Sequence, residues 1–380
     1  MIYLDNGATT LRKPAVVKEA MIDALDHLGN AGRGGTPTAL STSRVIFEAR
    51  ERMNQLLHGE GSAQVVFTSN VTESLNIAIQ GLFQPGDHLI TTTMEHNSVL
   101  RPCYLMAERG VELTILPADH QGNIHLSDLE SAIQPNTKGI VITHASNLTG
   151  NVTSLDQVSE IAHRHGLLLI VDAAQTCGAR SIDVQKLKID VLCFTGHKSL
   201  MGPQGTGGMY IRPGVMIPPL KLGGTGIDTF SHTQPEEYPT HLEAGTMNGH
   251  GLAGLNAALG YLLDYGVERI EQEEASLRKY LVDGIKDLPN VTIYGDMEEE
   301  EHVPIVTINI GEEDSADIGL ALADRYGIIV RTGGHCAPLM HQTFHTERQG
   351  AVRFSLSHYT TVEEIDTAIS AIRTLSQEAL

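Results

Sequence analysis

The sequence predicts an α/β protein with a mostly parallel sheet in a large domain, followed by a smaller α+β C-terminal domain. Short apolar, β-rich runs alternate with helical stripes over the first 250 residues. These runs are apolar at almost every position, which is typical of strands that helices cover on both faces. Beyond residue 250 the alternation stops and longer helical patterns precede the next strands. We therefore expect a large domain over residues 14–250 and a small domain formed by residues 1–13 and 251–380.

The elements of the large domain are predicted from hydrophobic periodicity. Ile46, Ala49 and Met53 recur at the helical period before the first strand of the sheet. Similar stripes lie around residues 75–82 and 158–162. The expected strands are residues 65–68, 88–92, 112–116, 139–143, 167–171, 191–194 and 208–211.

The small domain is expected to open with one long helical stretch over residues 251–288. A capping box, Thr361-Val-Glu-Glu364, predicts the start of the last helix, which carries Ile365, Ile369 and Ile372 on one face. A further helix is expected over residues 316–326. The expected strands are residues 291–294, 305–310, 328–331 and 352–355.

Composition disfavours several classes of partner. The 380 residues include 26 Lys and Arg against 46 Asp and Glu, a net charge of −20. This balance argues against nucleic acid and anionic membrane surfaces as main partners. The four cysteines form no C-x-x-C pair, and no leader segment or membrane-length apolar run is evident. We expect a cytoplasmic protein with free thiols.

Polar side chains follow several of the predicted strands, where α/β sheets place ligands. Lys198 comes just after the strand at 191–194, and Asp172 ends the strand at 167–171. His96 follows the strand at 88–92, and Ser69-Asn-Val-Thr-Glu-Ser74 joins a strand to a helix. Pyridoxal 5'-phosphate (PLP) needs such a set: a lysine for its aldehyde, an acid for its ring nitrogen, a flat group and a phosphate cradle.

Each of these residues also has a simpler explanation. An isolated lysine is usually solvated, Asp172 could be a helix N-cap, and a single histidine is more often structural. Every strand-to-helix unit needs a cap, so the segment around Asn70 and Glu73 is weak by itself. Only the occurrence of all four features together favours PLP.

The segment Arg331-Thr-Gly-Gly-His-Cys-Ala-Pro338 suggests a reactive thiol. Glycines give the loop freedom, and His335 lies beside Cys336 as a candidate helper for a thiolate. Arg353, on the next strand, could clamp a substrate carboxylate. Cys177 and Cys193 stand in apolar strand contexts that predict inert, buried thiols.

Two other motifs are rejected. Cys336, His341 and His345 have zinc-ligand types, but no fourth ligand is evident and Pro338 interrupts, so we expect no metal. Residues 249–254, Gly-His-Gly-Leu-Ala-Gly, match the dinucleotide fingerprint in letters only. No apolar strand precedes them, so close helix packing explains these glycines better.

With these residues in place, the chain resembles the class V aminotransferase branch of fold-type I PLP enzymes. It is most similar to group II (SufS-type) cysteine desulfurases and selenocysteine lyases. The resemblance runs over nearly the whole chain in ordered motifs: Tyr3-Leu-Asp-Asn-Gly-Ala8, Met94-Glu-His96, Ser146-Asn147, Val171-Asp-Ala-Ala-Gln175, Gly196-His-Lys198, Glu243-Ala-Gly-Thr246 and 331–337.

The resemblance implies a role for each matching residue. Lys198 would carry PLP, Asp172 would pair with the ring nitrogen, and His96 would stack on the ring. The remaining cofactor contacts would come from Gln175 at the ring hydroxyl and from Thr72, Thr195, His197 and, from a second subunit of a homodimer, Thr246 at the phosphate.

The resemblance also implies a reaction. Asn147 and Arg353 would hold the carboxylate of L-cysteine, and Cys336 would take its sulfur as a persulfide while L-alanine leaves. The sulfur would pass to an acceptor protein whose identity the sequence leaves open, in iron–sulfur cluster assembly or another branch of sulfur or selenium metabolism.

Departures from the family pattern keep alternatives open. Gly334 stands where many relatives have a second histidine before the cysteine, and Asn97 follows His96 where a second histidine is common. Selenocysteine lyase, another class V lyase or an aminotransferase are therefore alternative activities. A PLP-fold docking protein without turnover is a third hypothesis, which the intact set of Lys198, Asp172 and His96 disfavours.

Overall fold

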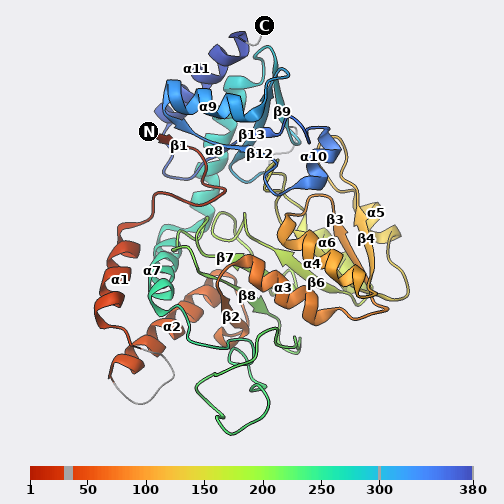
Figure 1. Ribbon diagram of the computed structural model, residues 1–380, viewed down its shortest axis with the longest axis vertical. Helices are drawn as coiled ribbons and strands as arrows, with labels where there is room; N and C mark the ends of the chain where they lie inside the picture. The colour runs from red at the N-terminus through yellow and green to blue at the C-terminus, as the bar shows by residue number, and fades with distance from the viewer. Residues whose placement is uncertain (30–36, 298–300, 379–380) are drawn as a thin grey trace.

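The computed structural model describes residues 1–29, 37–297 and 301–378. A seven-stranded sheet forms the centre of the large domain, which lies below the small domain in Figure 1. Its strand order is β2-β8-β7-β6-β5-β3-β4. The strands are β2 (Val65–Thr68), β3 (His88–Thr92), β4 (Glu112–Leu116), β5 (Thr137–Thr143), β6 (Leu168–Asp172), β7 (Val191–Thr195) and β8 (Gly207–Ile211).

The sheet is mostly parallel, as predicted. The strands from β7 through β6, β5 and β3 to β4 are all parallel, and β8 runs antiparallel to both β2 and β7. Every residue of β3, β6 and β7 except Leu168 is buried, which explains their continuous apolar runs. The expected mostly parallel α/β fold is confirmed.

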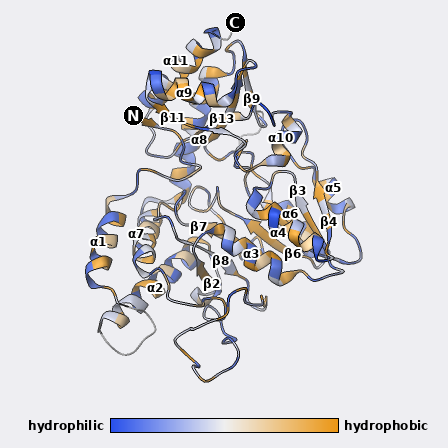
Figure 2. Ribbon diagram, viewed as in Figure 1, coloured by the Kyte–Doolittle hydropathy of each residue, from blue (hydrophilic) through white to orange (hydrophobic). Residues whose placement is uncertain are grey.

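Helices cover both faces of this sheet. One face packs with α2 (Pro37–Leu56), α6 (Leu155–Arg164) and α7 (Gly249–Tyr265), and the other with α3 (Val71–Leu82) and α4 (Asn97–Glu108). These helices carry orange and blue residues side by side in Figure 2, as amphipathic helices do. Shorter elements complete the domain: α1 (Ala15–His27), the 3₁₀ turn η1 (Ser62–Gln64) and α5 (Leu126–Ser131).

The helical stretch expected at 251–288 is two helices, α7 and α8 (Val267–Ile285). They meet at Gly266, whose φ of 93° lies outside the range a helix accepts. Leu252, Leu255 and Leu259 of α7 pack in the core of the large sheet. We therefore propose that the domains divide near Gly266 rather than at residue 250.

The small domain combines an antiparallel sheet, β12-β13-β10-β9, with helices that pack on it. Its elements are β9 (Val291–Tyr294), β10 (Ile305–Ile310), α9 (Ser315–Tyr326), β12 (Arg331–Gly333), α10 (Pro338–Phe344), β13 (Ala351–Ser355) and α11 (Val362–Glu378). The predicted strand at 328–331 is split, because β11 (Ile328–Ile329) pairs with β1 (Ile2–Tyr3) and β12 pairs with β13. The capping box at α11 is present: Glu364 N donates to Thr361 Oγ1, and Thr361 N donates to Glu364 Oε2.

No helix within the described ranges is both long and apolar enough to cross a lipid bilayer.

Candidate active site

The parallel strands bring the predicted residues to one edge of the large sheet. Asp172 ends β6, and its Cα partners are Thr143 at the end of β5 and Cys193 on β7. Lys198 follows β7, and His96 follows β3. Because parallel strands end at the same edge, these side chains come from adjacent positions in space.

Asp172 and Lys198 form an electrostatic pair. Asp172 is buried, and its Oδ1 accepts a hydrogen bond from Ala174 N at 2.9 Å. Burial raises the pKa of Asp172, and the Lys198 cation opposes this. Burial lowers the pKa of Lys198 to about 8, with Asp172 opposing it and Arg353 adding to it. The residues after Asp172 form a turn and no helix, so the N-cap explanation is wrong.

His96 presents a neutral ring. It caps α4, and its Nδ1 accepts a hydrogen bond from Ser98 N at 3.0 Å, which leaves the ring proton on Nε2. Burial, with a further contribution from the Lys198 charge, lowers the pKa of His96 to about 4. The ring is therefore uncharged at neutral pH, as a flat surface against a cationic cofactor ring requires.

Two of the residues expected at the phosphate are Thr72, in the first turn of α3, and Thr195, at the end of β7. Asn70 caps this helix by accepting from Glu73 N at 3.0 Å. Thr72 Oγ1 lies 2.8 Å from Ser98 Oγ, which links α3 to the His96 turn. Thr195 is buried, and its Oγ1 has no hydrogen-bond partner among the described residues.

Three other predicted cofactor residues have different surroundings. His197 Nδ1 lies 3.0 Å from Thr9 Oγ1, and burial lowers the pKa of His197 to about 4. Gln175 Nε2 donates to Gly7 O at 3.2 Å. Thr246 is exposed in the loop before α7 and lines a cavity of about 220 Å³ whose walls include Ser69 and Lys221.

These side chains fit PLP. The partly buried amine of Lys198 can reach its reactive neutral form near pH 8. Asp172 offers a buried carboxylate that needs a cationic or N–H partner. The hydroxyl of Thr195 is buried without a partner among the described residues, and it could donate a hydrogen bond to an anionic group.

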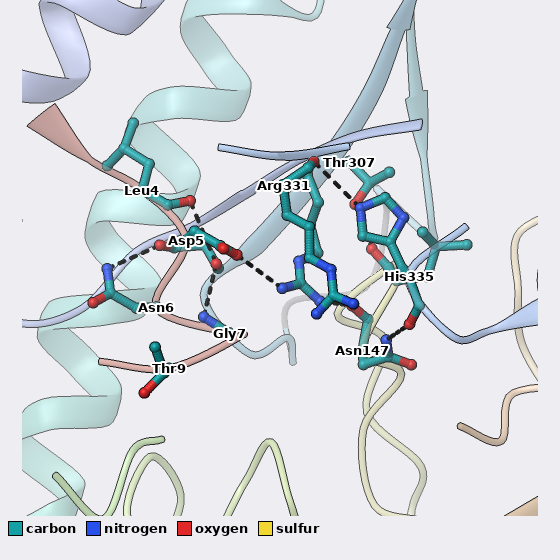
Figure 3. Close-up of polar contacts among 12 residues, drawn as sticks. Leu4, Asp5, Asn6, Gly7, Thr9, Asn147, Thr307, Arg331 and His335 are labelled. Atoms are coloured by element: carbon teal, nitrogen blue, oxygen red, sulfur yellow. Dashed lines mark hydrogen bonds and ion pairs between the residues drawn. The ribbon is translucent and has the colours of Figure 1, made fainter. Parts of the chain in front are cut away.

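The Cys336 loop joins β12 to α10 and is anchored on the large domain. Cys336 is exposed, and both His335 and Cys336 have left-handed backbones, with φ of 50° and 56°. Asn97 N donates to Cys336 O at 2.9 Å, and Asn147 Nδ2 donates to His335 O at 2.7 Å. Figure 3 shows the second contact. The loop therefore rests on the residue that follows His96.

His335 is not the helper of Cys336 that its position in the sequence suggested. It is only 3% exposed, and its Nε2 lies 3.3 Å from Arg331 O (Figure 3). Its ring stacks on that of His341, with 5.8 Å between the ring centroids. Burial, with the Arg353 charge, lowers the pKa of His335 to about 3, so its ring is a poor base.

Arg331, which sequence reasoning did not single out, places Nη2 4.0 Å from Cys336 Sγ.

Arg353 is fully buried and joins three segments. Its Nη1 donates to Asn147 O at 2.8 Å and its Nη2 to Asp5 Oδ1 at 3.1 Å. Its Nε has no partner in the described part of the chain. Burial lowers the pKa of Arg353 to about 10, so it remains cationic at neutral pH. Sequence reasoning missed Asp5, although it lies in the first motif that carries the resemblance.

The structure also describes the surroundings of the two rejected motifs, the zinc-like set at Cys336 and the glycines at 249–254. Within the described ranges, no three His, Cys, Asp or Glu side chains are grouped so that they could hold a metal ion. Gly254 lies in α7, where an added Cβ would come within 2.8 Å of Met21 Cγ, so its glycine serves close packing. Cys177 and Cys193 are buried as predicted, and Cys103 is buried as well.

Comparison with known proteins agrees with this geometry. The family description Aminotransferase class-V matches residues 2–367. The chain belongs to the class-V aminotransferase family. This family is PLP-dependent, so the expected cofactor and fold-type I architecture are confirmed.

Cysteine desulfurases are among the similar proteins. A probable cysteine desulfurase of Methanothermobacter thermautotrophicus is 34% identical over 370 residues, which are 96% of this chain and 92% of that protein. A cysteine desulfurase of Pectobacterium carotovorum is 34% identical over 98% of this chain and 92% of its own length. The apo structure of a Thermococcus onnurineus cysteine desulfurase has a TM-score of 0.92 and 33% identity, covering 99% and 95% of the two chains.

Proposed function

We propose that this chain is a PLP-dependent cysteine desulfurase that converts L-cysteine to L-alanine and takes the sulfur on Cys336 as a persulfide. The observation that carries the proposal is the anchoring of the Cys336 carbonyl to Asn97 N, the residue after His96. This contact supports the proposal, because Asn97 follows β3 at the sheet edge where Lys198 and Asp172 lie, and Cys336 itself is exposed. An aminotransferase of the same fold has no need of such a thiol.

The cofactor supplies an electron sink for bonds broken at the α- and β-carbons of the substrate. Asp172 would hold its ring nitrogen, and Lys198 would hold its aldehyde carbon. Thr72, Thr195, His197 and Thr246 would bind its phosphate, Gln175 its ring hydroxyl, and His96 would lie against the ring. With a pKa of about 8, the Lys198 amine can accept the α-proton near neutral pH and return it.

Arg353 and Asn147 would bind the substrate carboxylate. Asn147 uses one Nδ2 hydrogen for His335 O, which leaves the other for a ligand. Arg353 adds a buried cation whose Nε is unpartnered among the described residues. A charge-assisted bond to a carboxylate would satisfy both groups.

The Cys336 thiolate would then attack the substrate sulfur. A sulfur–sulfur bond forms and the carbon–sulfur bond breaks, and its electron pair remains with the substrate carbon. That carbon takes up a proton, and L-alanine leaves. Arg331 Nη2 is placed to donate a hydrogen bond to the anionic persulfide.

Four finer features remain predictions: a group II (SufS-type) subclass, a homodimer that shares Thr246, transfer to a protein acceptor, and a cytoplasmic location. The exposed position of Cys336 supports transfer to a protein, because a persulfide formed there can be reached by a second thiol.

The test is alanine release from L-cysteine by PLP-loaded protein in the presence of a thiol reductant. The wild type should form alanine, and Cys336→Ala should lose at least about 100-fold in rate while it retains the absorbance of bound PLP, because only the nucleophile is missing. Equal rates for both proteins would contradict the role of Cys336. Turnover of selenocysteine alone, or of keto acids, would establish one of the alternative activities.

A further inference from the structure

Glu95 is a buried carboxyl group that the proposed reaction does not use. It lies between β3 and α4, directly before His96, and it is fully buried. Its Oε1 accepts hydrogen bonds from Thr92 Oγ1 at 2.7 Å and from Thr143 N at 3.0 Å. Its Oε2 is buried and has no hydrogen-bond partner among the residues that the structure describes. An ionised carboxylate is expensive in such a place.

The contacts of Glu95 connect it to Asp172. Thr143, which donates to Glu95, ends β5 and is the Cα partner of Asp172 on β6. Two titratable groups interact electrostatically with Glu95. The charge of Asp172, on β6, raises the pKa of Glu95, and the charge of Glu95 raises the pKa of the buried Cys103 thiol on α4. Neither is a cation, so Glu95 has no charge partner of opposite sign in this set. Burial, with the charge of Asp172, raises the pKa of Glu95 to about 8.

We propose that Glu95 is a positioning residue that is kept protonated next to Asp172, and that its proton keeps the cofactor ring nitrogen protonated. Repulsion between like charges is the physical reason. Two neighbouring buried carboxyl groups do not both ionise readily, so Asp172 can be an anion only while Glu95 is neutral. The inference rests on the proposed pairing of Asp172 with the ring nitrogen.

The location of Glu95 determines how its ionisation affects the protonation of the ring nitrogen. Glu95 is connected to Asp172 rather than to the ring nitrogen itself, because it accepts a hydrogen bond from Thr143, the strand neighbour of Asp172. When Glu95 loses its proton, its negative charge draws the proton shared between Asp172 and the ring nitrogen toward Asp172. The ring then becomes a weaker electron sink. A fall in activity at alkaline pH is the functional consequence.

The test uses PLP that carries ¹⁵N in its ring, bound to the full-length protein, because the ¹⁵N chemical shift reports directly whether this nitrogen is protonated. In the wild type the signal should move toward that of an unprotonated ring as pH rises through about 8. Glu95→Gln keeps an oxygen for Thr92 and Thr143 and cannot ionise, so this pH-dependent step in the ¹⁵N chemical shift should be lost. A step of equal size in Glu95→Gln, or no step above pH 7 in the wild type, would overturn the proposal.

Two further variants separate the possible causes. Glu274, on α8, is a matched control: it is 5% exposed, burial raises its pKa to about 8, and its Oε2 is also unpartnered in the described ranges. Glu274→Gln should retain the wild-type step, and loss of the step there would contradict a role specific to Glu95. Asp172→Asn should shift the signal toward the unprotonated ring already at pH 7; an unchanged signal would overturn both the pairing and the role of Glu95. Because the measurement needs no turnover, a failed desulfurase assay leaves its outcome readable.

Discussion

Lys198 shows how a side chain becomes reactive through its surroundings. Partial burial lowers the pKa of Lys198 to about 8, against about 10.4 for a solvated lysine. Since the neutral amine is the nucleophile, capture of PLP by the apoprotein should speed up with rising pH and level off above about pH 8. Stopped-flow absorbance between pH 6.5 and 9.5 measures this.

Asp172 supplies the control for that experiment. Its charge raises the pKa of Lys198, so Asp172→Asn should move the midpoint to lower pH. A capture rate that still rises steeply at pH 9.5 in the wild type would show that Lys198 behaves as a solvated lysine.

Some residues of the proposed site could be predicted from the sequence, and others could not. The location of Lys198, Asp172 and His96 at strand ends of the large sheet could be predicted, because each ends or follows an apolar run. Arg331 and Asp5 could not, because their partners Cys336 and Arg353 are contacts of the folded chain. The surroundings of His335 could not be predicted either, because its position next to Cys336 in the sequence does not show that its ring is buried.

At the level of elements, the strands of the large sheet could be predicted to within about two residues, because each is a short apolar run. The direction of β8 could not be predicted, since an apolar run looks the same in a parallel and an antiparallel strand. The break at Gly266 was also missed. One glycine in a long helical pattern is compatible with a continuous helix, and only its φ of 93° shows that the helix ends there.

The loop from β12 to α10 is held by the buried ring of His335. His335→Asn keeps a residue that accepts the left-handed backbone but removes the contacts with Arg331 O and His341. We expect opening of the loop to become easier by about 1–3 kcal/mol. Amide exchange at Asn97, whose N–H donates to Cys336 O, should then become roughly tenfold faster or more.

A histidine elsewhere provides the comparison for this loop. His358→Asn removes a partly buried ring that contacts Tyr261 and lies outside the loop. It should leave amide exchange at Asn97 unchanged. If His335→Asn also leaves it unchanged, the backbone contacts alone fix the position of Cys336.

On the scale of the whole molecule, the proposed active site lies between the two proposed domains. Arg353 and Cys336 come from the small domain, and they contact Asn147 and Asn97 of the large domain. Asp5 reaches Arg353 from the N-terminal segment, which pairs with the small domain through β1. Movement of one domain against the other would therefore change the substrate site and the position of the thiol together.

The segment between β8 and α7 bears on assembly. It forms the long green loop at the bottom of Figure 1, and it exposes 73% of Leu222, 52% of Ile227 and 96% of Phe230. Thr246 follows in the same segment. Apolar side chains gathered on one exposed loop are typical of an interface. If a second copy of the chain covers them, Phe230→Ser should weaken the dimer by about 1.5–3 kcal/mol, roughly tenfold to a hundredfold in Kd.

Analytical ultracentrifugation over a range of concentrations measures this Kd. Leu320→Ser is the matched control, because Leu320 is 59% exposed on α9, at the opposite end of the molecule in Figure 1. If Thr246 from one copy binds the phosphate in the other, Phe230→Ser should also weaken PLP binding when the protein is diluted below the new Kd, and high protein concentration should restore it. PLP affinity that does not depend on protein concentration would show that each chain completes its own phosphate site.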